Sequence, residues 1–597
     1  MVKYKNWVFV VLILFFLLFS FSPTIFELFQ SNNLTDKNRE FILEHNYYWP
    51  DYNLYLSKIR QGFEGHLTAK ELYTSESHRG SLIQEFYVVL GLLGRYLKLV
   101  PNYSYLLGRI IFAPLLLIVI LKLVKYYFPS TSVRVRPLAP LRSDPIAWQI
   151  ISFLIIIVSG SFPRFWFDQN GALQIGRYME WWSNIDSLQR ITFIPHILFG
   201  QVVSFFLLYQ LVIRVRPLTP LRSDPVLIFY IILGNLVGLV FPPSLITLNG
   251  VILLLIFVKS YKSLVLIAGD VKEGIPNVAS PALSPAERGD FEAKIGKLSR
   301  QDPQIIVYFL FIIFTLPSLL YIYLLTKQLP WSALLNFHRT HPMMIPLDQY
   351  VLGTGPIIFL GFFGAIISII KKEEKYRPLI LWLVVTFGLA SFFSIVKEQS
   401  PLRFTQTGLF IPLGILGAYF LRRLSNLSYL RYLSYLSIII YIFGNLFMMK
   451  VSFDWQVSWI GQLIAATYPA VPYPPQTVFP LKDWMAGIRW LRDNTKSDDV
   501  ILAEITAGNY IPAYSGNTVY FGQANTYDYE NKQILVDKFF KGEFNLNQAE
   551  IFIKNGRIKY VFEDKNLPAG ETGLSGIYPF LKPVFHNSIV TIYKVKS

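Results

Sequence analysis

The stretch Trp7–Phe29, WVFVVLILFFLLFSFSPTIFELF, is an apolar run long enough to cross a bilayer as a helix. Lys3 and Lys5 precede it, so it could pass for a signal peptide. We expect it to be retained as a membrane span, because it is long, has no convincing small-residue cleavage site and is followed by many further apolar runs. These further runs are residues 104–128, 146–162, 193–213, 226–244, 246–259, 305–326, 351–370, 379–396, 404–421 and 434–449. The sequence therefore predicts a polytopic α-helical membrane protein with about eleven transmembrane helices.

The amino-acid composition is that of a membrane protein. Of the 597 residues, 53% are apolar and only 16% are charged, against roughly 25% in ordinary soluble proteins. The chain has 55 Lys and Arg and 38 Asp and Glu, a formal net charge of +17. In a membrane protein such an excess is explained first by cytoplasmic loops, so we expect no nucleic-acid partner. The absence of cysteine excludes disulfides, thiol catalysis and cysteine-ligated zinc.

The basic residues between the apolar runs set the predicted topology. With a cytoplasmic N-terminus, every strongly basic loop falls on the cytoplasmic side, as the positive-inside rule requires. These loops lie within residues 122–142, 214–222, 259–300, 371–377 and 422–431. Counting the apolar stretch 84–100 as another span would move the later loops outside, and it carries Glu85 and Arg95, so we expect a juxtamembrane helix there. An odd number of spans places the loop 30–103 and the tail after Lys450 outside the cytoplasm.

Two of the cytoplasmic loops carry nearly the same motif. Residues 134–145 read RVRPLAPLRSDP and residues 214–225 read RVRPLTPLRSDP, differing only where Ala139 stands opposite Thr219. In each copy an Asp precedes a Pro, which predicts an N-cap and the first position of a helix. We interpret the copies as a duplicated basic hinge at the inner leaflet; lipid-headgroup binding is the alternative.

The C-terminal part of the chain has a different character. We expect a membrane domain at residues 1–450, a proline-rich linker at 451–480 and an extracytoplasmic α/β domain at 481–597. Within that domain the hydrophobic patterns predict helices and strands in alternation. The expected elements are helices at 484–492 and 530–540 and strands at 500–503, 518–521, 559–562 and 589–595. The chain contains no glycine-rich nucleotide-binding motif.

The first outer loop contains the most suggestive carboxylate. In the stretch NYYWPDYNLY (46–55), Pro50 predicts a helix start that places Asp51 in the first turn. Tyr52 and Tyr55 then lie one turn apart on the same face. A carboxylate among aromatic rings suits a general base beside sugar-stacking surfaces. The alternative is an acidic residue that only stabilises the helix N-terminus.

Most other ionisable residues lie on the outer side of the predicted topology. The interiors of the later predicted spans lack charged residues, and the second span contains only Arg109 besides Lys122 and Lys125 at its cytoplasmic end, which argues against a proton or ion pathway. The second outer loop offers Asp168, Glu180 and Asp186, with His196 after them, but their spacings specify no metal geometry. We therefore expect no metal and no cofactor.

The order of these features resembles the GT-C-fold integral membrane glycosyltransferases. One span precedes a large outer loop with an early Asp; then come a juxtamembrane helix in QEFYVVLGLLG, many spans, an Arg-Phe pair in SPLRFTQTGLFIPLGILGA and an outer α/β tail. The tail stretch WLRDNTKSDDVILAEITAGNYIPAYSG is similar to the extracytoplasmic segment of bacterial members. In particular, the chain resembles bacterial enzymes of the protein O-mannosyltransferase (glycosyltransferase family 39-like) and lipid A aminoarabinose transferase kind.

The resemblance implies transfer of a sugar from a polyprenyl-phosphate donor to an extracytoplasmic lipid, glycan or protein acceptor. Asp51 matches the family's acidic residue that activates the acceptor hydroxyl, with inversion at the anomeric carbon. Arg403 matches its arginine before a late helix and is the first candidate for the donor phosphate; Arg109 and Arg339 are weaker candidates. The alternative for each arginine is an interfacial snorkelling residue. The expected sugar or acceptor contacts are Tyr52, Tyr55, His196, Glu180 and Asp186.

Two other functional classes stay open. One is a lipid or solute transporter, against which the scarcity of intramembrane charge and of inverted repeats argues. The other is a non-catalytic partner in polysaccharide export that uses the tail as a binding module. The resemblance also has a gap, because metal-dependent oligosaccharyltransferases carry a DxD-like acidic pair and the first outer loop has none. A site that joins Asp51 to Arg403 would favour the enzyme.

Overall fold

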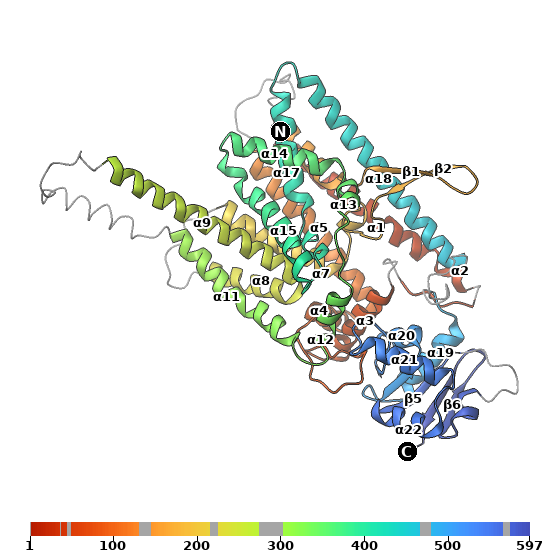
Figure 1. Ribbon diagram of the computed structural model, residues 1–597. Helices are drawn as coiled ribbons and strands as arrows, with labels where there is room; N and C mark the ends of the chain where they lie inside the picture. Colours follow the sequence, from red (N-terminus) through yellow and green to blue (C-terminus); the bar gives the residue numbers. More distant parts are fainter. Residues whose placement is uncertain are drawn as a thin grey trace, which may run out of the picture.

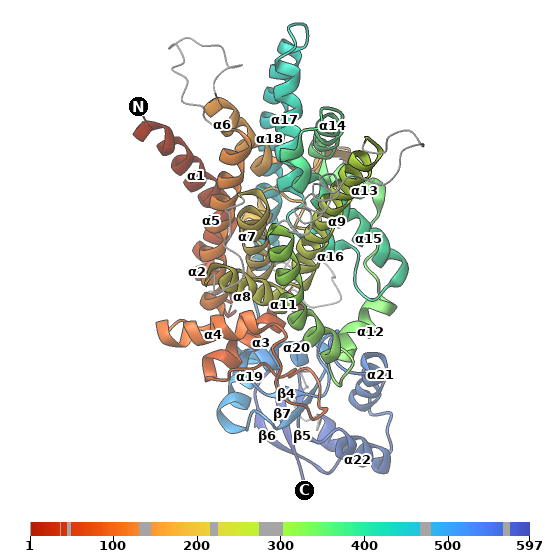
Figure 2. The same ribbon diagram turned by 90° about the vertical axis from the view of Figure 1, so that its left-hand side faces the viewer.

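The computed structural model describes residues 2–35, 38–43, 49–129, 145–214, 225–273, 303–465, 479–564 and 573–596. A helical bundle forms one end of the molecule and an α/β domain the other (Figure 1). The N-terminus lies at the far end of the bundle and the C-terminus at the far end of the α/β domain (Figure 2). The greater part of both duplicated basic motifs falls outside the described residues, so the hinges stay a prediction.

Each predicted apolar run lies on a helix of the bundle. The helices are α1 (Val2–Phe29), α5 (Pro101–Tyr127), α6 (Pro145–Val158), α7 (Pro195–Leu207) with its continuation η3 (Leu208–Ile213), α8 (Pro225–Val240), α9 (Pro242–Glu273), α11 (Pro303–Leu325), α13 (Leu347–Thr354) with α14 (Pro356–Ile370), α15 (Arg377–Val396), α17 (Phe410–Ser425) and α18 (Arg431–Ala465). In the described part of the chain, seven helices are long and apolar enough to cross a membrane, or eight if α13 and α14 form one span. The helices α6 and α8 are shorter apolar helices. The protein is thus a multi-pass membrane protein.

The predicted run at 351–370 is bent where the sequence reads Gly355-Pro356. The helices α13 and α14 meet there at 88°. Gly355 has a φ of 74°, and a Cβ at this position would lie 1.9 Å from the carbonyl oxygen of Gly160. Only glycine fits both the backbone conformation and this close approach.

The helix α17 lies at the centre of the bundle, where most of its side chains are buried. The single turn α16 (Leu402–Thr405) precedes it and carries Arg403. Because α17 is held on all sides, the position of Arg403 is fixed by the core of the bundle.

The helix α18 corrects one predicted boundary. It continues to Ala465, so the expected end of the membrane domain at residue 450 falls inside a helix. The ion pair between Lys450 and Asp454, one helical turn apart, and the stacked rings of Trp455 and Trp459 support this extension. Of the predicted linker 451–480, residues 451–465 are helical, and residues 466–478 lie outside the described ranges.

The first outer loop forms two closely packed helices on the outer end of the bundle. After α2 (Ser31–Thr35) come α3 (Trp49–Glu64) and α4 (Glu85–Leu97), the predicted juxtamembrane helix. The helix α4 lies across the ends of the bundle helices (Figure 2). A Cβ at Gly62 would lie 2.0 Å from the Val88 carbonyl oxygen, and one at Gly91 would lie 2.0 Å from that of Ile59. The two glycines therefore allow α3 and α4 to pack backbone against backbone.

The remaining elements outside the α/β domain are short. The second outer loop contains the antiparallel hairpin β1 (Pro163–Phe167) and β2 (Leu173–Arg177), followed by η2 (Gln189–Ile191). The loop between α11 and α13 contains α12 (Ser332–Thr340), and η4 (Glu374–Tyr376) connects α14 to α15. Neither the hairpin nor α12 was predicted from the sequence.

The α/β domain contains a mixed five-stranded sheet with the order β4-β3-β5-β7-β6. Its elements are α19 (Lys482–Asn494), β3 (Val500–Ala503), α20 (Ile505–Tyr514), β4 (Thr518–Val519), α21 (Tyr529–Phe540), α22 (Leu546–Asn555), β5 (Ile558–Glu563), α23 (Gly573–Ile577), β6 (Leu581–His586) and β7 (Thr591–Val595). The strands β4, β3 and β5 run parallel, and β7 pairs antiparallel with both β5 and β6. All six predicted elements are confirmed, whereas α20, α22, α23 and β6 were missed.

The first outer loop supplies part of the core of this domain. Ile42, Leu54 and Tyr73 pack in one hydrophobic cluster with residues of α19 and α20. The chain before α3 also joins the start of the domain, where Glu40 N–H donates to the carbonyl of Pro480 at 2.8 Å. The α/β domain is therefore completed by residues from the other end of the sequence.

Candidate functional site

Asp51 lies in the first turn of α3, as predicted, and its side chain is partly buried. Burial raises the pKa of this carboxyl to about 6, and the positive charge of Arg403 opposes the rise. Near neutral pH the group is therefore ionised in large part, yet it binds a proton far more tightly than an exposed aspartate does. Such a carboxylate is well suited to general-base catalysis.

Arg403 approaches the same place from the outer end of α17. Its Nε atom is buried and has no hydrogen-bond partner among the residues that the structure describes. Its charge acts on Asp51 and Tyr55 of α3, on His196 at the start of α7 and on His338 of α12. The charge of Arg403 thus acts on two loop helices, α3 and α12, and on the bundle helix α7, and Arg403 forms no ion pair within the described ranges.

Aromatic rings form one wall beside the two charged residues. The ring of Tyr55 stacks on that of Tyr87 at a centroid distance of 4.5 Å and meets His196 edge to face at 5.5 Å. The hydroxyl of Tyr87 lies 2.7 Å from Nδ1 of His196. Burial, followed by the charge of Asp51, raises the pKa of the Tyr55 hydroxyl. The predicted residues Asp51, Tyr55, His196 and Arg403 are therefore brought together, and Tyr87 joins them.

Tyr52 contributes to the core instead of the wall. Its hydroxyl donates to the carbonyl of Leu43 at 2.7 Å, and its ring packs edge to face on Tyr105 at 5.0 Å. It is only 1% exposed, so no surface remains for a sugar.

The other two candidate arginines are held elsewhere. Arg109 is buried, and its guanidinium donates to the carbonyl of Thr192 and to Oγ1 of Thr24 at 3.2 Å. These bonds tie α5 to α1 and to the second outer loop. Arg339 is paired with Glu398 on the surface.

Glu180 and Asp186 belong to the second outer loop, and the following contacts join them to residues of that same loop. Glu180 accepts a hydrogen bond from the backbone N–H of Arg177 at 3.2 Å. Asp186 is buried in an ion pair with the Arg177 side chain, and it accepts from Leu188 N–H at 2.9 Å. Both carboxylates thus shape the loop.

His338 is a residue of the site that the sequence analysis did not single out. Its Nδ1 atom is buried without a partner among the described residues. Burial, and then the charge of Arg403, lowers its pKa to about 3. The side chain is therefore a neutral imidazole next to Arg403. The only sequence signal was its position beside Arg339.

The α/β domain holds α3 from the side opposite the bundle. The Asn53 amide donates to Oδ1 of Asn509 at 2.8 Å, and both residues are buried. Arg60 donates to the carbonyl of Tyr514 at 2.6 Å, and the Tyr73 hydroxyl donates to the carbonyl of Asn509 at 3.0 Å. The helix that carries Asp51 is thereby fixed between α4 and α20.

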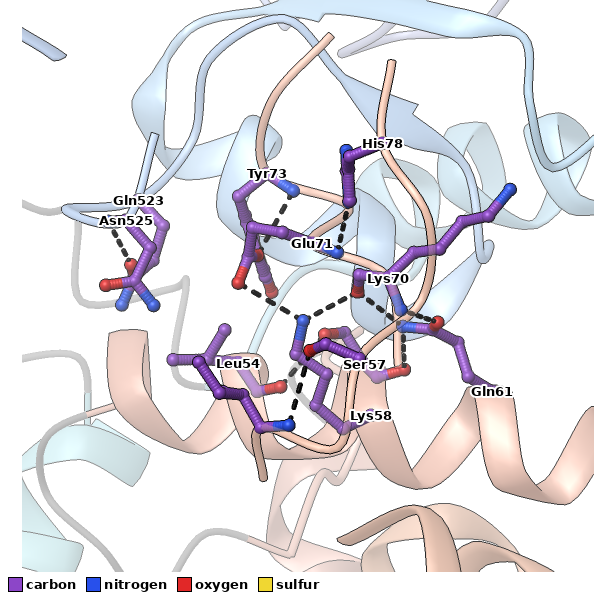
Figure 3. Close-up of polar contacts among 12 residues, drawn as sticks. Leu54, Ser57, Lys58, Gln61, Lys70, Glu71, Tyr73, His78, Gln523 and Asn525 are labelled. Carbon is purple, nitrogen blue, oxygen red and sulfur yellow. Dashed lines mark hydrogen bonds and ion pairs between the residues drawn. The ribbon is translucent and has the colours of Figure 1, made fainter. Parts of the chain in front are cut away.

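A buried ion pair secures the loop between α3 and α4 (Figure 3). Nζ of Lys58 lies 3.2 Å from Oε2 of Glu71 and donates to the carbonyl of Lys70 at 2.7 Å. His78 accepts from Glu71 N–H at 2.8 Å, and the ring of Trp331 lies 5.6 Å from Nζ of Lys58. This network joins the first outer loop to the loop that contains α12.

No group of three or more His, Cys, Asp or Glu residues that could hold a metal occurs in the described part of the chain. The chemistry available there is that of one carboxylate, one unpaired guanidinium, a neutral imidazole and aromatic surfaces.

Known proteins share the fold but little sequence. No protein-family model and no curated protein sequence matches the chain. The fold is similar to that of the archaeal oligosaccharyltransferase AglB from Archaeoglobus fulgidus, solved in complex with an inhibitory peptide and a dolichol-phosphate. The TM-score is 0.50 and the identity 13%, over 92% of this chain and 69% of that chain.

Two further structures have lower TM-scores. The apo form of the Archaeoglobus fulgidus oligosaccharyltransferase matches with a TM-score of 0.49 and 13% identity, over 98% of this chain and 74% of that one. ArnT from Cupriavidus metallidurans, bound to undecaprenyl phosphate, matches with a TM-score of 0.46 and 11% identity, over 97% of each chain. Both values lie below 0.5, so the assignment of the fold rests on the AglB complex. The expected GT-C fold, with a C-terminal α/β domain, is confirmed.

Proposed function

We propose that this GT-C-fold protein is a membrane glycosyltransferase that moves a sugar from a polyprenyl-phosphate donor to an acceptor outside the cytoplasm. The observation that carries the proposal is the proximity of Asp51 and Arg403, two residues far apart in the sequence. The positive charge of Arg403 is near enough to oppose the rise in the pKa of Asp51. A base and an unpaired cation beside an aromatic wall are what such a reaction requires.

Asp51 acts as the general base in this proposal. Its carboxylate accepts the proton of the acceptor hydroxyl while the oxygen forms a bond to the anomeric carbon. The bond from that carbon to the phosphate oxygen breaks, and its electron pair leaves with the polyprenyl phosphate. Attack opposite the leaving group inverts the anomeric carbon, and one carboxylate is enough because the phosphate needs no protonation to leave.

Arg403 stabilises the phosphate as negative charge develops on its leaving oxygen. Its buried Nε without a described partner supports this role, because a buried N–H group without an acceptor favours a ligand that supplies one, such as a phosphate oxygen. Arg109 and Arg339 were weaker candidates, and their hydrogen bonds to Thr192 and Glu398 support structural roles. Tyr55 and His196 supply the surface beside the sugar. The dolichol-phosphate bound in the similar AglB structure agrees with a polyprenyl-phosphate donor.

The predicted orientation puts this chemistry outside the cytoplasm. A cytoplasmic N-terminus and an extracytoplasmic α/β domain are supported by the location of the two termini at opposite ends of the molecule (Figure 2). The site lies at the end of the bundle that faces the α/β domain, which is where a lipid donor in the outer leaflet would present its phosphate.

The test uses the full chain in lipid nanodiscs and a panel of short-chain polyprenyl-phosphate hexoses and pentoses. Release of polyprenyl phosphate is measured in the presence of membrane glycolipid acceptors. We expect Asp51→Asn to lower kcat by at least about 10²-fold without weakening donor binding. Arg403→Gln should weaken donor binding, and Arg339→Gln, the matched surface control, should do neither. Undiminished transfer by Asp51→Asn would remove Asp51 as the base.

A further inference from the structure

The hairpin formed by β1 and β2 projects sideways from the bundle beside α18 (Figure 1). Its turn is rigid, because Oδ1 of Asp168 accepts from the N–H groups of Asn170 and Ala172, each at 2.9 Å. Oδ2 of Asp168 accepts from Nε2 of Gln174 at 2.8 Å. The hairpin is therefore an ordered element with a polar tip.

One face of the hairpin is apolar except at its base, where the buried Arg177 pairs with Pro163. In the antiparallel register Phe165 pairs with Ile175 and Phe167 pairs with Leu173, so their four side chains share one face. Phe165 is 59% exposed, Phe167 72% and Leu173 55%. Such large side chains side by side on an unpartnered two-stranded sheet are unfavourable in water.

The opposite face is polar and interfacial in composition. It carries Arg164, Trp166 and Gln174. The Arg164 guanidinium lies 5.8 Å from the centroid of the Trp166 ring, which also covers Gly176. Arginine and tryptophan are the residue types that anchor membrane proteins at the headgroup level. The hairpin is thus amphipathic, with period-2 alternation between its faces.

The base of the hairpin lies at the depth where α18 leaves the apolar layer. The apolar run of α18 ends before Lys450, which forms an exposed ion pair with Asp454. One residue further, the ring of Trp455 lies 5.3 Å from the guanidinium of Arg177 at the end of β2. A charged pair followed by a tryptophan marks the membrane–water interface. The contact with Arg177 therefore fixes the hairpin at that interface.

From these observations we propose that the β1–β2 hairpin lies in the outer surface of the bilayer, with Phe165, Phe167, Leu173 and Ile175 among the lipid acyl chains. Arg164, Trp166 and Gln174 face the headgroups. Lipid is the occupant that the structure favours, because the apolar face continues the lipid-facing surface of a membrane protein at interfacial depth. This assignment does not depend on the proposed transferase activity.

The absence of cysteine from the chain makes a direct test possible. A single spin label is placed on the apolar face with Phe167→Cys and, as the matched control, on the opposite face with Gln174→Cys. Both full-length variants are reconstituted into phospholipid vesicles, and unfolding temperatures are compared with the parent protein. Electron paramagnetic resonance then measures label collision with oxygen, which concentrates in hydrocarbon, and with a water-soluble nickel chelate.

We expect the label at residue 167 to favour oxygen over nickel several-fold more than the label at residue 174. Equal and high nickel accessibility at both positions would show that the hairpin stands in water and would overturn the proposal. Protection of residue 167 from both reagents would also overturn it, because a second copy or another protein would then cover the face.

Discussion

The raised pKa of Asp51 predicts how the rate of transfer depends on pH. With a pKa of about 6, roughly nine-tenths of the carboxyl is ionised at pH 7 and roughly one-tenth at pH 5. If Asp51 is the general base, kcat/KM should therefore fall about tenfold between these pH values. An aspartate with the ordinary pKa of 3.8 would still be largely ionised at pH 5, and kcat/KM would hardly change. A transfer assay with labelled donor easily distinguishes a tenfold fall in kcat/KM from an almost unchanged value.

Substitution of Arg403 tests the physical origin of this pKa. Arg403→Gln removes the positive charge that opposes the rise, so the pKa of Asp51 should increase and the acid limb of the pH profile should move to higher pH. Arg403→Lys keeps a positive charge and should leave the limb closer to that of the parent. A phosphodiester donor does not titrate in this interval, so the limb reports the protein.

Glu85 could produce a similar limb. Burial raises the pKa of Glu85, at the start of α4, to about 7. Glu85→Gln is therefore the control, and it should leave the limb in place. A flat profile from pH 7 to pH 5, or a limb that disappears in Glu85→Gln, would refute the assignment of Asp51 as the titrating base. His338 does not interfere, because its pKa of about 3 lies below the interval.

Three predictions concern the support of α3. Asn509→Ala leaves the buried amide of Asn53 without its 2.8 Å acceptor, so we expect a loss of about 1–3 kcal/mol in stability and a lower kcat with a nearly unchanged KM for the donor, measured by thermal unfolding and transfer assays. Equal loss of kcat in Asn531→Ala, an exposed residue of α21, would show that the effect is not specific. Lys58→Met leaves Glu71 buried and unpaired and should lower the free energy of unfolding by about 3–5 kcal/mol. The double variant Lys58→Met with Glu71→Gln should restore much of this loss. No recovery in the double variant would contradict the ion-pair explanation. Gly91→Ala places a methyl group 2.0 Å from the Ile59 carbonyl oxygen and should destabilise the protein by about 1–3 kcal/mol, whereas Gly388→Ala, with nothing within 4 Å, should be neutral; similar unfolding temperatures for the two would contradict the close packing of α3 and α4.

The membrane architecture could be predicted because long apolar runs have few alternatives. Every predicted run lies on a helix, and the juxtamembrane helix and six elements of the tail are where hydrophobic periodicity placed them. The sharp bend at Gly355 was not predicted, because it depends on the approach of a distant carbonyl at Gly160. The hairpin of the second outer loop was missed because its aromatic strands are not buried, and alternation of polar and apolar residues is blurred where both faces carry rings.

The candidate site could be predicted only in part. Asp51 and Arg403 were found through a local helix-start signal and a short motif, and neither signal says that the two side chains meet. Arg339 was named while the adjacent His338 is the residue beside Arg403. Successive residues of a helix point about 100° apart, so Arg339 reaches Glu398 on the surface and His338 turns inward. Such an orientation depends on the packing of α12, which no pattern within one helix reveals.

The shared core of the first outer loop and the α/β domain has a consequence for the order of biosynthesis. Leu54 and Tyr73 are synthesised long before the residues of α19 and α20 that cover them. These contacts join segments more than four hundred positions apart, as in the bond from Asn53 to Asn509. During synthesis the loop therefore keeps these apolar side chains uncovered until α19 and α20 have been made, so the helix that carries Asp51 gains its full support late.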